Sequence, residues 1–413
     1  MKNYRAMDSV RTIIQSLLNS VENLTRPQEK FILTLFSTLL VSCGRATFTN
    51  LGRYSHLSER TYRRQYQHSF NFIKFNQQLI EQAIKPEAEM ILAVDCSFIP
   101  KSGHKTYGLD YFYNGSASKA EKGLEISAMA VVDVRQKTAY SLSVQQTPAN
   151  SSFSNQSGQP QTTRIDYYLT QLQATVPYLP SSLRYVVSDG FYSKVKWVEG
   201  VTDLKLDAIG KLRRDANLRY LYQDEYSGRG RPRKYQGKVE LNDYRNFKLA
   251  AQISDDVALY TAVVWSISLK RQIRICYLLN SAGFDSSYAV LFCTDLNLDP
   301  YSIYLYYKAR FQIEFVFRDS KQFTGLADCQ ARDLTKLDFH FNSALTALNL
   351  AKLDAVQQHS ADSDFVFSMA SYKRRGLNYH LLERFIDKLD LEPTLIKSHP
   401  NYPNLCNYGA IAA

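Results

Sequence analysis

The sequence predicts an α/β protein with a mixed sheet at its centre, a helical domain before it, a β-rich insertion within it and a helical tail after it. Apolar residues follow helical spacing up to about residue 88, and from residue 90 they alternate or form short runs as strands do. Three strands, a helix, a strand and a second helix follow, which is typical of a sheet of mixed direction. We therefore divide the chain into residues 1–88, 89–203, 204–284, 285–360 and 361–413, of which the second and fourth form the α/β core.

The first 88 residues carry clear helix signals. In the stretch LTRPQEKFILTLFSTLL, Thr25 is placed as an N-cap and Pro27 lies in the first turn, before an apolar face. Residues 49–54 predict a short helix, a turn follows, and Ser58 can cap the next helix.

That next helix has an apolar face and a basic face. The aromatic residues at four-residue spacing can point inward, and the basic residues then point outward: Tyr62, Tyr66 and Phe70 on one side, Arg60, Arg63, Arg64 and Gln67 on the other. The pair of helices resembles a helix-turn-helix with a basic recognition helix. An ordinary helical hairpin with a solvated basic face explains the same pattern equally well.

The core strands are predicted in MILAVDCSFI, GLEISAMAVVDV, AYSLSVQQ and LRYVVSDGFYS, with helices in TRIDYYLTQLQATV and SKVKWVEGV. The first strand is predicted to end at Asp95, and the fourth at Asp189, which Gly190 follows. Acids at strand ends in an α/β sheet are where ligand sites form. An acid that ends a single apolar strand is also a common structural feature.

The stretch YYKARFQIEFVFRDSK, residues 306–321, predicts one helix with an unusual polar stripe. Tyr307, Arg310, Glu314 and Lys321 fall within about 60° of each other on a helical wheel. Large apolar residues surround this stripe. Arg310 and Glu314 are four residues apart, so a simple surface ion pair is the alternative interpretation.

Asp95, Asp189 and Glu314 together predict a metal site. Two or three converging carboxylates offer the charged oxygen ligands that Mg²⁺ or Mn²⁺ prefers. Two such ions can stabilise the attacking and the leaving oxygens of a phosphoryl displacement. The neighbouring Arg310 and Lys321 could then hold the phosphates of the substrate.

The composition agrees with a partner that carries many negative charges. The net charge is +11, which favours nucleic acid, although a basic enzyme with another substrate has the same balance. Six scattered cysteines without a C-x-x-C pair indicate reduced thiols in a cytoplasmic protein. The chain shows neither a signal peptide nor an apolar stretch long enough to span a bilayer.

At this point the sequence resembles a family. The spacing Y-x2-R-x3-E-x6-K at residues 307–321 is similar to the signature of the DDE transposases of bacterial insertion sequences, in the group named after insertion sequence four. The segments AVDCS and VVSDGFYS look like those that carry the two aspartates of this family. The β-rich insertion between the second aspartate and the glutamate is another trait of the group.

The resemblance implies a fold, a reaction and partners. The fold is a ribonuclease-H-like catalytic core, and the reaction is cut-and-paste transposition of an insertion sequence by two Mg²⁺ ions, for which Mn²⁺ substitutes. Asp95, Asp189 and Glu314 are the metal ligands, and Tyr307, Arg310 and Lys321 contact DNA phosphates. The partners are the double-stranded terminal inverted repeats, target DNA and a second copy of the chain in a synaptic complex in the bacterial nucleoid, with the tail as a candidate dimerisation element.

Two other functions fit the same residues. One is a catalytically inactive, transposase-derived DNA-binding protein, against which the complete set of three acids argues. The other is a metal-dependent DNA nuclease that performs no strand transfer.

The insertion adds a second basic feature, SGRGRPRKYQGK at residues 227–238. Its glycines and proline exclude a regular helix, and its arginines and lysines favour contact with DNA: Arg229, Arg231, Arg233, Lys234 and Lys238. The Arg-Gly-Arg-Pro core resembles an AT-hook, and a flexible basic loop that binds the backbone without preference is the alternative.

Trp265 lies in the same insertion. In some relatives an insertion-domain tryptophan stacks on a flipped base, whereas tryptophan in an apolar strand is more often a core residue. Cys96 follows Asp95 directly, so it should point to the opposite face of the strand and serve the core.

Overall fold

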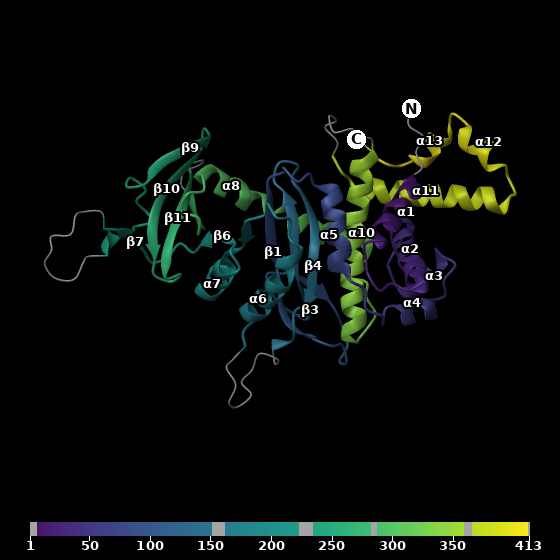
Figure 1. Cartoon of the computed structure of the whole chain (residues 1–413), viewed down its shortest axis with the longest axis horizontal. Helices are drawn as coiled ribbons and strands as arrows, with labels where there is room; N and C mark the ends of the chain where they lie inside the picture. The colour runs from purple at the N-terminus through teal and green to yellow at the C-terminus, as the bar shows by residue number, and fades with distance from the viewer. Residues whose placement is uncertain (1–5, 151–161, 223–233, 282–286, 359–365, 412–413) are drawn as a thin grey trace.

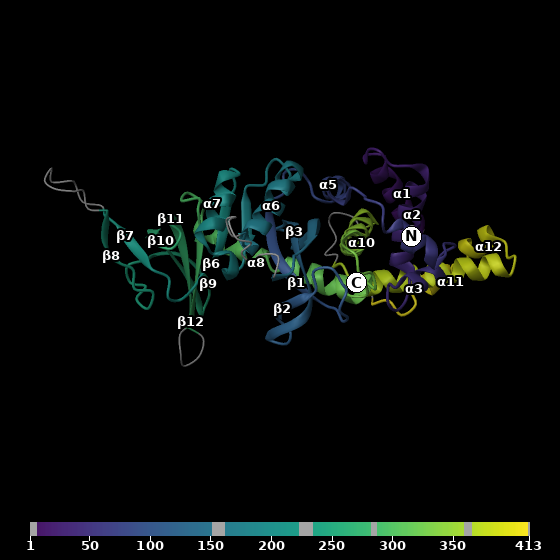
Figure 2. The ribbon, with the colours of Figure 1, turned by 90° about the horizontal axis from the view of Figure 1, so that it is seen from below.

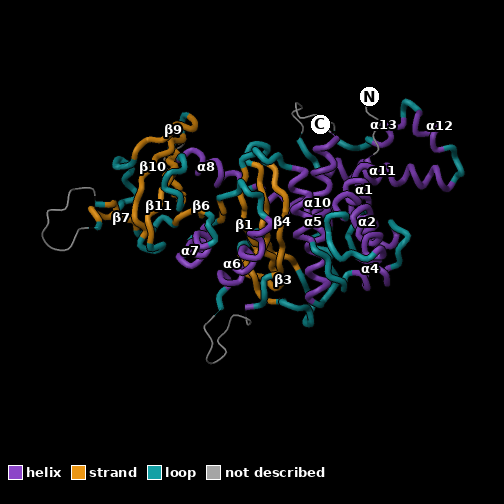
Figure 3. The backbone as a smooth tube through the Cα atoms, viewed as in Figure 1, coloured by secondary structure: helices purple, strands orange, loops and turns teal. Residues whose placement is uncertain are grey.

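The computed structural model describes residues 6–150, 162–222, 234–281, 287–358 and 366–411. The molecule is elongated, with a β-rich region at one end, an α/β region in the middle and a helical region at the other end (Figures 1 and 3). The mixed α/β character expected from the sequence is confirmed.

The amino-terminal region is helical as expected. Its helices are α1 (Ala6–Leu18), α2 (Arg26–Val41), α3 (Phe48–Arg53), α4 (Glu59–Gln65) and α5 (Phe72–Ala83). Both α2 and α4 begin directly after the predicted caps Thr25 and Ser58. Thr25 forms a capping box with Gln28, and the Ser58 side chain accepts a hydrogen bond from the backbone of Thr61. Tyr62 and Tyr66 are buried as expected. Phe70 lies beyond the end of α4 and is only half-buried, so it does not continue the apolar face of that helix.

The central sheet contains β1 (Met90–Pro100), β3 (Lys119–Asp133), β4 (Thr138–Gln146), β5 (Tyr185–Ser188) and β6 (Asp207–Leu212). Their spatial order is β4, β3, β1, β5, β6. β1 is antiparallel to β3 and parallel to β5, and β5 is parallel to β6. This large mixed sheet is consistent with the expected ribonuclease-H-like core.

One prediction about β1 is wrong. The strand does not end at Asp95 but continues to Pro100, because β3 pairs with it along its whole length. Its pairing with β5 does stop at Val94, so Asp95 is the first residue that lacks a neighbour on that side. β2 (Asp110–Asn114) extends the other edge of β3.

The sheet passes without interruption into the β-rich region. β6 lies inside the range that the sequence analysis gave to the insertion, yet it pairs with β5 on one side and with β12 (Ser287–Cys293) on the other. The remaining strands follow from β12: β7 (Leu218–Leu221), β8 (Tyr235–Lys238), β9 (Lys248–Ser254), β10 (Val257–Ser266) and β11 (Arg271–Asn280). The two parts therefore share one sheet of 12 strands.

The free edge of β4 is covered by α10 (Leu334–Gln358), which stands beside β4 and α5 in Figure 1. Asn349 of α10 accepts a hydrogen bond from the backbone nitrogen of Ser141 (3.0 Å) and donates one to its carbonyl oxygen (2.7 Å). The Asn349 side chain thus satisfies backbone groups that would otherwise be open to pairing with another strand. α10 is consequently buried on most sides.

Different helices cover the two faces of the central sheet. α6 (Arg164–Thr175) and α7 (Val195–Asp203) pack on the face toward which Cys96 points, since its thiol contacts Tyr192, which packs on both helices. The segment α8 (Pro300–Ala309) and α9 (Gln312–Asp319) lies on the face toward which Asp95 points. Figure 2 shows α8 running from the β-rich region to the central strands.

One helix prediction needs correction. The single helix expected over residues 306–321 is divided, because α8 ends at Ala309, α9 begins at Gln312, and a π-helical turn spans Ser320–Thr324. The tail is helical as expected and contains the 20-residue helix α11 (Met369–Lys388), followed by α12 (Pro393–Ser398) and α13 (Tyr402–Cys406). Within the described ranges, no helix has the length and apolar character needed to cross a membrane.

Candidate active site

Sheet register places Asp95 and Asp189 next to each other. Val94 of β1 and Ser188 of β5 are parallel partners, and the two aspartates are the next residues along each chain. Asp189 caps the short 3-10 turn Gly190–Tyr192, and its Oδ1 accepts a hydrogen bond of 2.9 Å from the backbone of Phe191. Asp95 Oδ1 accepts one of 2.8 Å from the backbone of Cys96. Each carboxylate therefore keeps one oxygen free of these backbone bonds.

Arg310 joins two of the three acids. Its Nη1 donates to Asp95 Oδ2 at 2.9 Å, and its Nη2 donates to Glu314 Oε1 at 3.3 Å. The Arg310 side chain is only 11% exposed, whereas Glu314 is 42% exposed. The guanidinium thus bridges a carboxylate from the sheet and one from a helix at the edge of solvent.

The helix break explains how Arg310 and Glu314 reach this position. Arg310 and Phe311 form the junction between α8 and α9, and the Glu314 nitrogen bonds to the Phe311 carbonyl three residues back. Glu314 therefore lies in the first turn of α9, where the positive end of the helix dipole favours a carboxylate. A regular helix through this segment would present the two side chains only as an i, i+4 pair.

The three acids influence one another. Burial raises the pKa of Asp95 to about 6; the Arg310 charge lowers this pKa, and Asp189 and Glu314 raise it. The Nε of Arg310 is buried and has no hydrogen-bond partner among the described residues. The site therefore holds an excess of negative charge around one imperfectly satisfied cation.

This arrangement fits a divalent metal in chemistry but not in its present geometry. Across the parts of the chain that the structure describes, no three His, Cys, Asp or Glu side chains lie close enough to hold an ion as they stand. The acids instead share the guanidinium of Arg310, which is a cation held by carboxylate oxygens. Asp95, Asp189 and Glu314 would hold Mg²⁺ once Arg310 turned away from Asp95 and Glu314.

The structure places the other two residues of the stripe differently. Tyr307 is half-buried beside Arg310, whose Cζ lies 5.7 Å from the centre of the Tyr307 ring. Lys321 lies in the π-helical turn after α9, and burial lowers its pKa. Tyr307, Arg310 and Glu314 are thus gathered at one place, and Lys321 lies beyond the helix in the π-helical turn.

The basic residues of α4 are accessible. Arg60, Arg63 and Arg64 are exposed, and Arg63 forms an ion pair with Glu59 of the same helix. α4 has only seven residues, so few side chains of one face could reach a groove. The basic face expected from the sequence is present, and its role in DNA binding stays a prediction.

The basic stretch of the insertion falls largely outside the described residues, which is where Arg229, Arg231 and Arg233 lie. Lys234 is exposed, and Lys238 pairs with Glu240. Trp265 of β10 is half-buried with its ring centre 6.0 Å from that of Tyr235, so it is not one of the fully buried core residues.

The sequence did not predict a polar cluster that lies on the face of the sheet opposite to the acids. The Cys96 thiol lies 3.3 Å from the Tyr192 hydroxyl, and the Tyr168 hydroxyl donates to Glu125 at 2.8 Å. Tyr192 belongs to the turn that Asp189 caps, so this contact ties the two aspartate-bearing segments together on the opposite face. Burial raises the pKa of the Cys96 thiol, which agrees with a structural and not a nucleophilic cysteine. Tyr192 had no signal of its own beyond its place three residues after Asp189.

A comparison with known families finds a match for this chain. A family model described as DDE superfamily endonuclease matches residues 20–272, which is more than half of the chain. The matched range includes Asp95 and Asp189 and ends before Glu314. No protein with a curated description matches the chain. Since the family model matches more than half of the chain, from α2 into β11, the chain belongs to the DDE superfamily of endonucleases.

Proposed function

We propose that the protein is a DNA transposase of the group named after insertion sequence four, which moves its element by cut-and-paste transposition. The observation that carries this proposal is the meeting of Asp95, Glu314 and the neighbouring Asp189 around Arg310. Membership of the endonuclease family implies a DNA substrate. The Tyr-Arg-Glu-Lys spacing supports the finer family assignment.

The proposed reaction is hydrolysis of a phosphodiester at the transposon end, followed by strand transfer. Asp95, Asp189 and Glu314 would hold Mg²⁺, or Mn²⁺ in its place, and a pair of bound ions would supply positive charge for the attacking and leaving oxygens of the displacement. Arg310, once released from Asp95 and Glu314, offers a planar pair of donors to a phosphate of the cut strand. Lys321 supplies a second positive charge. The half-buried Tyr307 packs beside the guanidinium of Arg310 and supports it from the protein side.

DNA recognition and assembly are assigned to the ends of the molecule. The exposed arginines of α4 and the basic stretch at 227–238 bind the terminal inverted repeats. α11 provides a surface for a second copy, because Leu381, Phe385 and Leu389 recur every four residues and are all more than half exposed. The homodimer would bring two ends together in the synaptic complex.

The test is a cleavage and strand-transfer assay on paired transposon ends with Mg²⁺. Single-turnover cutting that releases a 3′-OH, followed by its joining to target DNA, supports the proposal. A second candidate, a DNA nuclease without strand transfer, is favoured by the description of the family and would cut without joining. Binding of ends without any metal-dependent cutting would contradict both functions and leave an inactive DNA-binding relative.

A further inference from the structure

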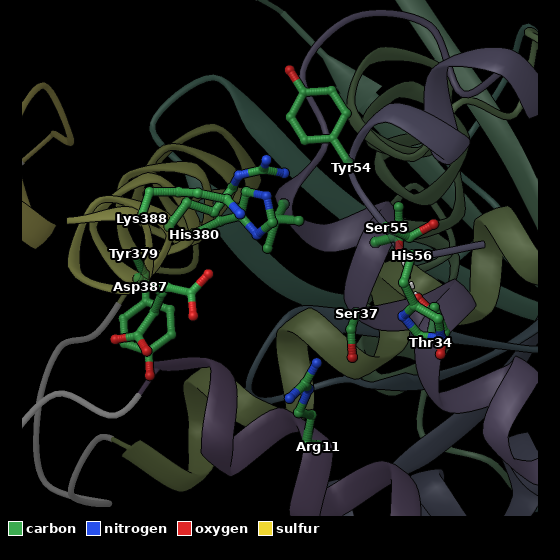
Figure 4. Close-up of a pocket in the computed structure, with 14 residues that line it drawn as sticks. Arg11, Thr34, Ser37, Tyr54, Ser55, His56, Tyr379, His380, Asp387 and Lys388 are labelled. Atoms are coloured by element: carbon green, nitrogen blue, oxygen red, sulfur yellow. Dashed lines mark hydrogen bonds between the residues drawn. The ribbon is translucent and has the colours of Figure 1, made fainter. Parts of the chain in front are cut away.

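A hollow of about 520 Å³ lies in the helical region, away from the three acids. Figure 4 shows that its lining comes from four places: α1, α2, the loop after α3 and α11. Its volume falls within the range of sites for small molecules. No lining residue belongs to the candidate active site.

The floor of the hollow contains an unsatisfied hydroxyl. Ser37 of α2 is only 7% exposed, and its Oγ has no hydrogen-bond partner among the described residues. Thr34 and Thr38 on the same helix each donate to the carbonyl oxygen four residues back, at 2.8 and 2.7 Å. Ser37 also lines the hollow but makes no such bond, so its buried hydroxyl lacks a partner in the structure.

Positive charge is concentrated at the same place. Arg11, Arg384 and Lys388 line the hollow, and within the described ranges none of them forms an ion pair. Of the two lining acids, Glu383 is neutralised by Lys397 at 2.8 Å and accepts a hydrogen bond from the Tyr402 hydroxyl, which leaves Asp387 alone on the rim.

The positive charges in the hollow affect His380. Burial lowers its pKa, and the charges of Arg384 and Arg11 lower it further, so both guanidiniums are near enough to act on the imidazole. The His380 ring also lies 6.0 Å from the Tyr54 ring, centre to centre. These cations repel one another and oppose protonation of the neighbouring imidazole. An anion that enters between them reduces this repulsion and is therefore held favourably.

We propose that this hollow binds a small phosphate-bearing ligand of about the size of a mononucleotide. The phosphate would pair with Arg11 and Arg384 and accept a hydrogen bond from Ser37, and the organic part would lie beside the rings of Tyr54 and His380. The same chemistry has two sources: a free phosphorylated small molecule, or a nucleotide at the 5′-end of a DNA strand. The site is independent of the acids that carry the proposed DNA cleavage.

The position of the site gives its occupancy a structural consequence. α11 stands on one side of the hollow, and the loop that joins α3 to α4 stands on the other. A bound ligand would therefore connect two elements. One is α11, which carries the proposed dimer surface, and the other is the α3–α4 helix pair, which carries the basic face. Occupancy would stabilise the contact between these two elements by mass action.

The test uses the full chain in calorimetric titrations and thermal melts. The probes are inorganic phosphate, adenosine monophosphate and a short single-stranded oligonucleotide with a 5′-phosphate. Arg384→Gln should weaken binding by about tenfold, because one charge-assisted contact is lost. Ser37→Ala should raise the melting temperature of the free protein, since an unpaired buried hydroxyl is removed, and should lower the affinity. Arg135→Gln, which removes an exposed arginine from the turn between β3 and β4, should change neither quantity.

The two sources are separated by the pattern of binding. Mononucleotide binding that both pocket variants weaken supports a free small-molecule ligand. Oligonucleotide binding that both variants weaken, without mononucleotide binding, supports a DNA end. The proposal is overturned if no probe binds, or if Ser37→Ala and Arg384→Gln bind every probe as tightly as the unaltered protein does.

Discussion

Arg310 and Arg384 are arginines with opposite surroundings. Arg310 lies between Asp95 and Glu314, is 11% exposed and bonds to both acids. Arg384 lines a hollow with Arg11 and Lys388, and no ion pair engages it within the described ranges. At the first site carboxylates surround one cation. At the second site three cations share the lining with Glu383, which Lys397 already neutralises, and with Asp387, so positive charge is in excess.

The contrast indicates which kind of ion each site can bind. Carboxylates that already hold a guanidinium can hold a divalent metal when that guanidinium leaves, so the first site is selective for positive charge. The second site has an excess of exposed positive charge, so it favours an anion.

The largest effect is expected at the acids themselves. Asp95→Asn, Asp189→Asn and Glu314→Gln should each slow Mg²⁺-dependent cleavage by more than about 100-fold, because the metal needs charged oxygen ligands. Binding of transposon ends should remain largely intact. Single-turnover cleavage and a gel-shift titration on the same preparation measure the two quantities. Near-normal cutting by one variant would remove that residue from the metal site.

Arg310→Gln should separate stability from metal binding. Without metal, the loss of the guanidinium leaves the Asp95 charge uncompensated and should lower the free energy of unfolding by about 3 kcal/mol. Mn²⁺ should bind more tightly to this variant, because it no longer competes with Arg310 for the carboxylates. Saturating Mn²⁺ should recover most of the lost stability.

Lys321→Gln is the matched control for that experiment. It also removes one positive charge from the stripe, but burial alone lowers the pKa of Lys321, so no carboxylate depends on it. Its metal-free stability and Mn²⁺ affinity should be nearly unchanged. Equal effects of the two substitutions would mean that Arg310 acts only through the general charge of the region.

Asp338 differs from Asp95 because it is a buried carboxyl group that forms no ion pair with an arginine among the described residues. Burial raises its pKa to about 6, and a hydrogen bond from Asn342 lowers it. The folded state therefore holds this proton more tightly than the unfolded state, so stability should rise as pH falls from about 7 to 4. Asp338→Asn should stabilise the protein by about 2 kcal/mol at pH 7.5, and this advantage should vanish near pH 4. Urea unfolding at both pH values measures it, and an equal gain at both would contradict the assignment.

The smallest effect is expected on α4. Arg63→Ala should weaken DNA binding only a few-fold, since Arg63 is exposed and already shares its charge with Glu59. Arg64→Ala, which removes an arginine without such a pair among the described residues, should weaken it somewhat more. Titrations over a range of salt concentrations should show a slope reduced by about one for a phosphate contact. A loss confined to the specific transposon end would instead indicate contact with bases.

The sequence predicted element types well where the hydrophobic period was unambiguous. The cap at Thr25, the short helix pair around Ser58 and the strands of the central sheet are all present. These depend on local chemistry, such as a side chain that caps its own helix. The convergence of Asp95 with Glu314 was also predicted, from strand ends and a resemblance to a family.

What the sequence did not predict depends on tertiary contacts. β1 runs past Asp95 because β3 continues beside it, and β6 joins the core because β5 and β12 lie on its two sides. The break at Arg310 carries neither proline nor glycine, so no local signal marks it. The hollow beside Ser37 combines residues from α1 and α11, which are more than 350 positions apart and share no motif.

We propose that Asp95, Asp189 and Glu314 hold a divalent metal in the place that Arg310 now fills. Anomalous diffraction from crystals of the protein with Mn²⁺ and a transposon-end duplex tests this directly. We expect Mn²⁺ density between the three carboxylates, with Arg310 turned from Asp95 toward a DNA phosphate. Arg310 still bonded to Asp95 and Glu314, with no Mn²⁺ beside them at saturating concentration, would contradict it.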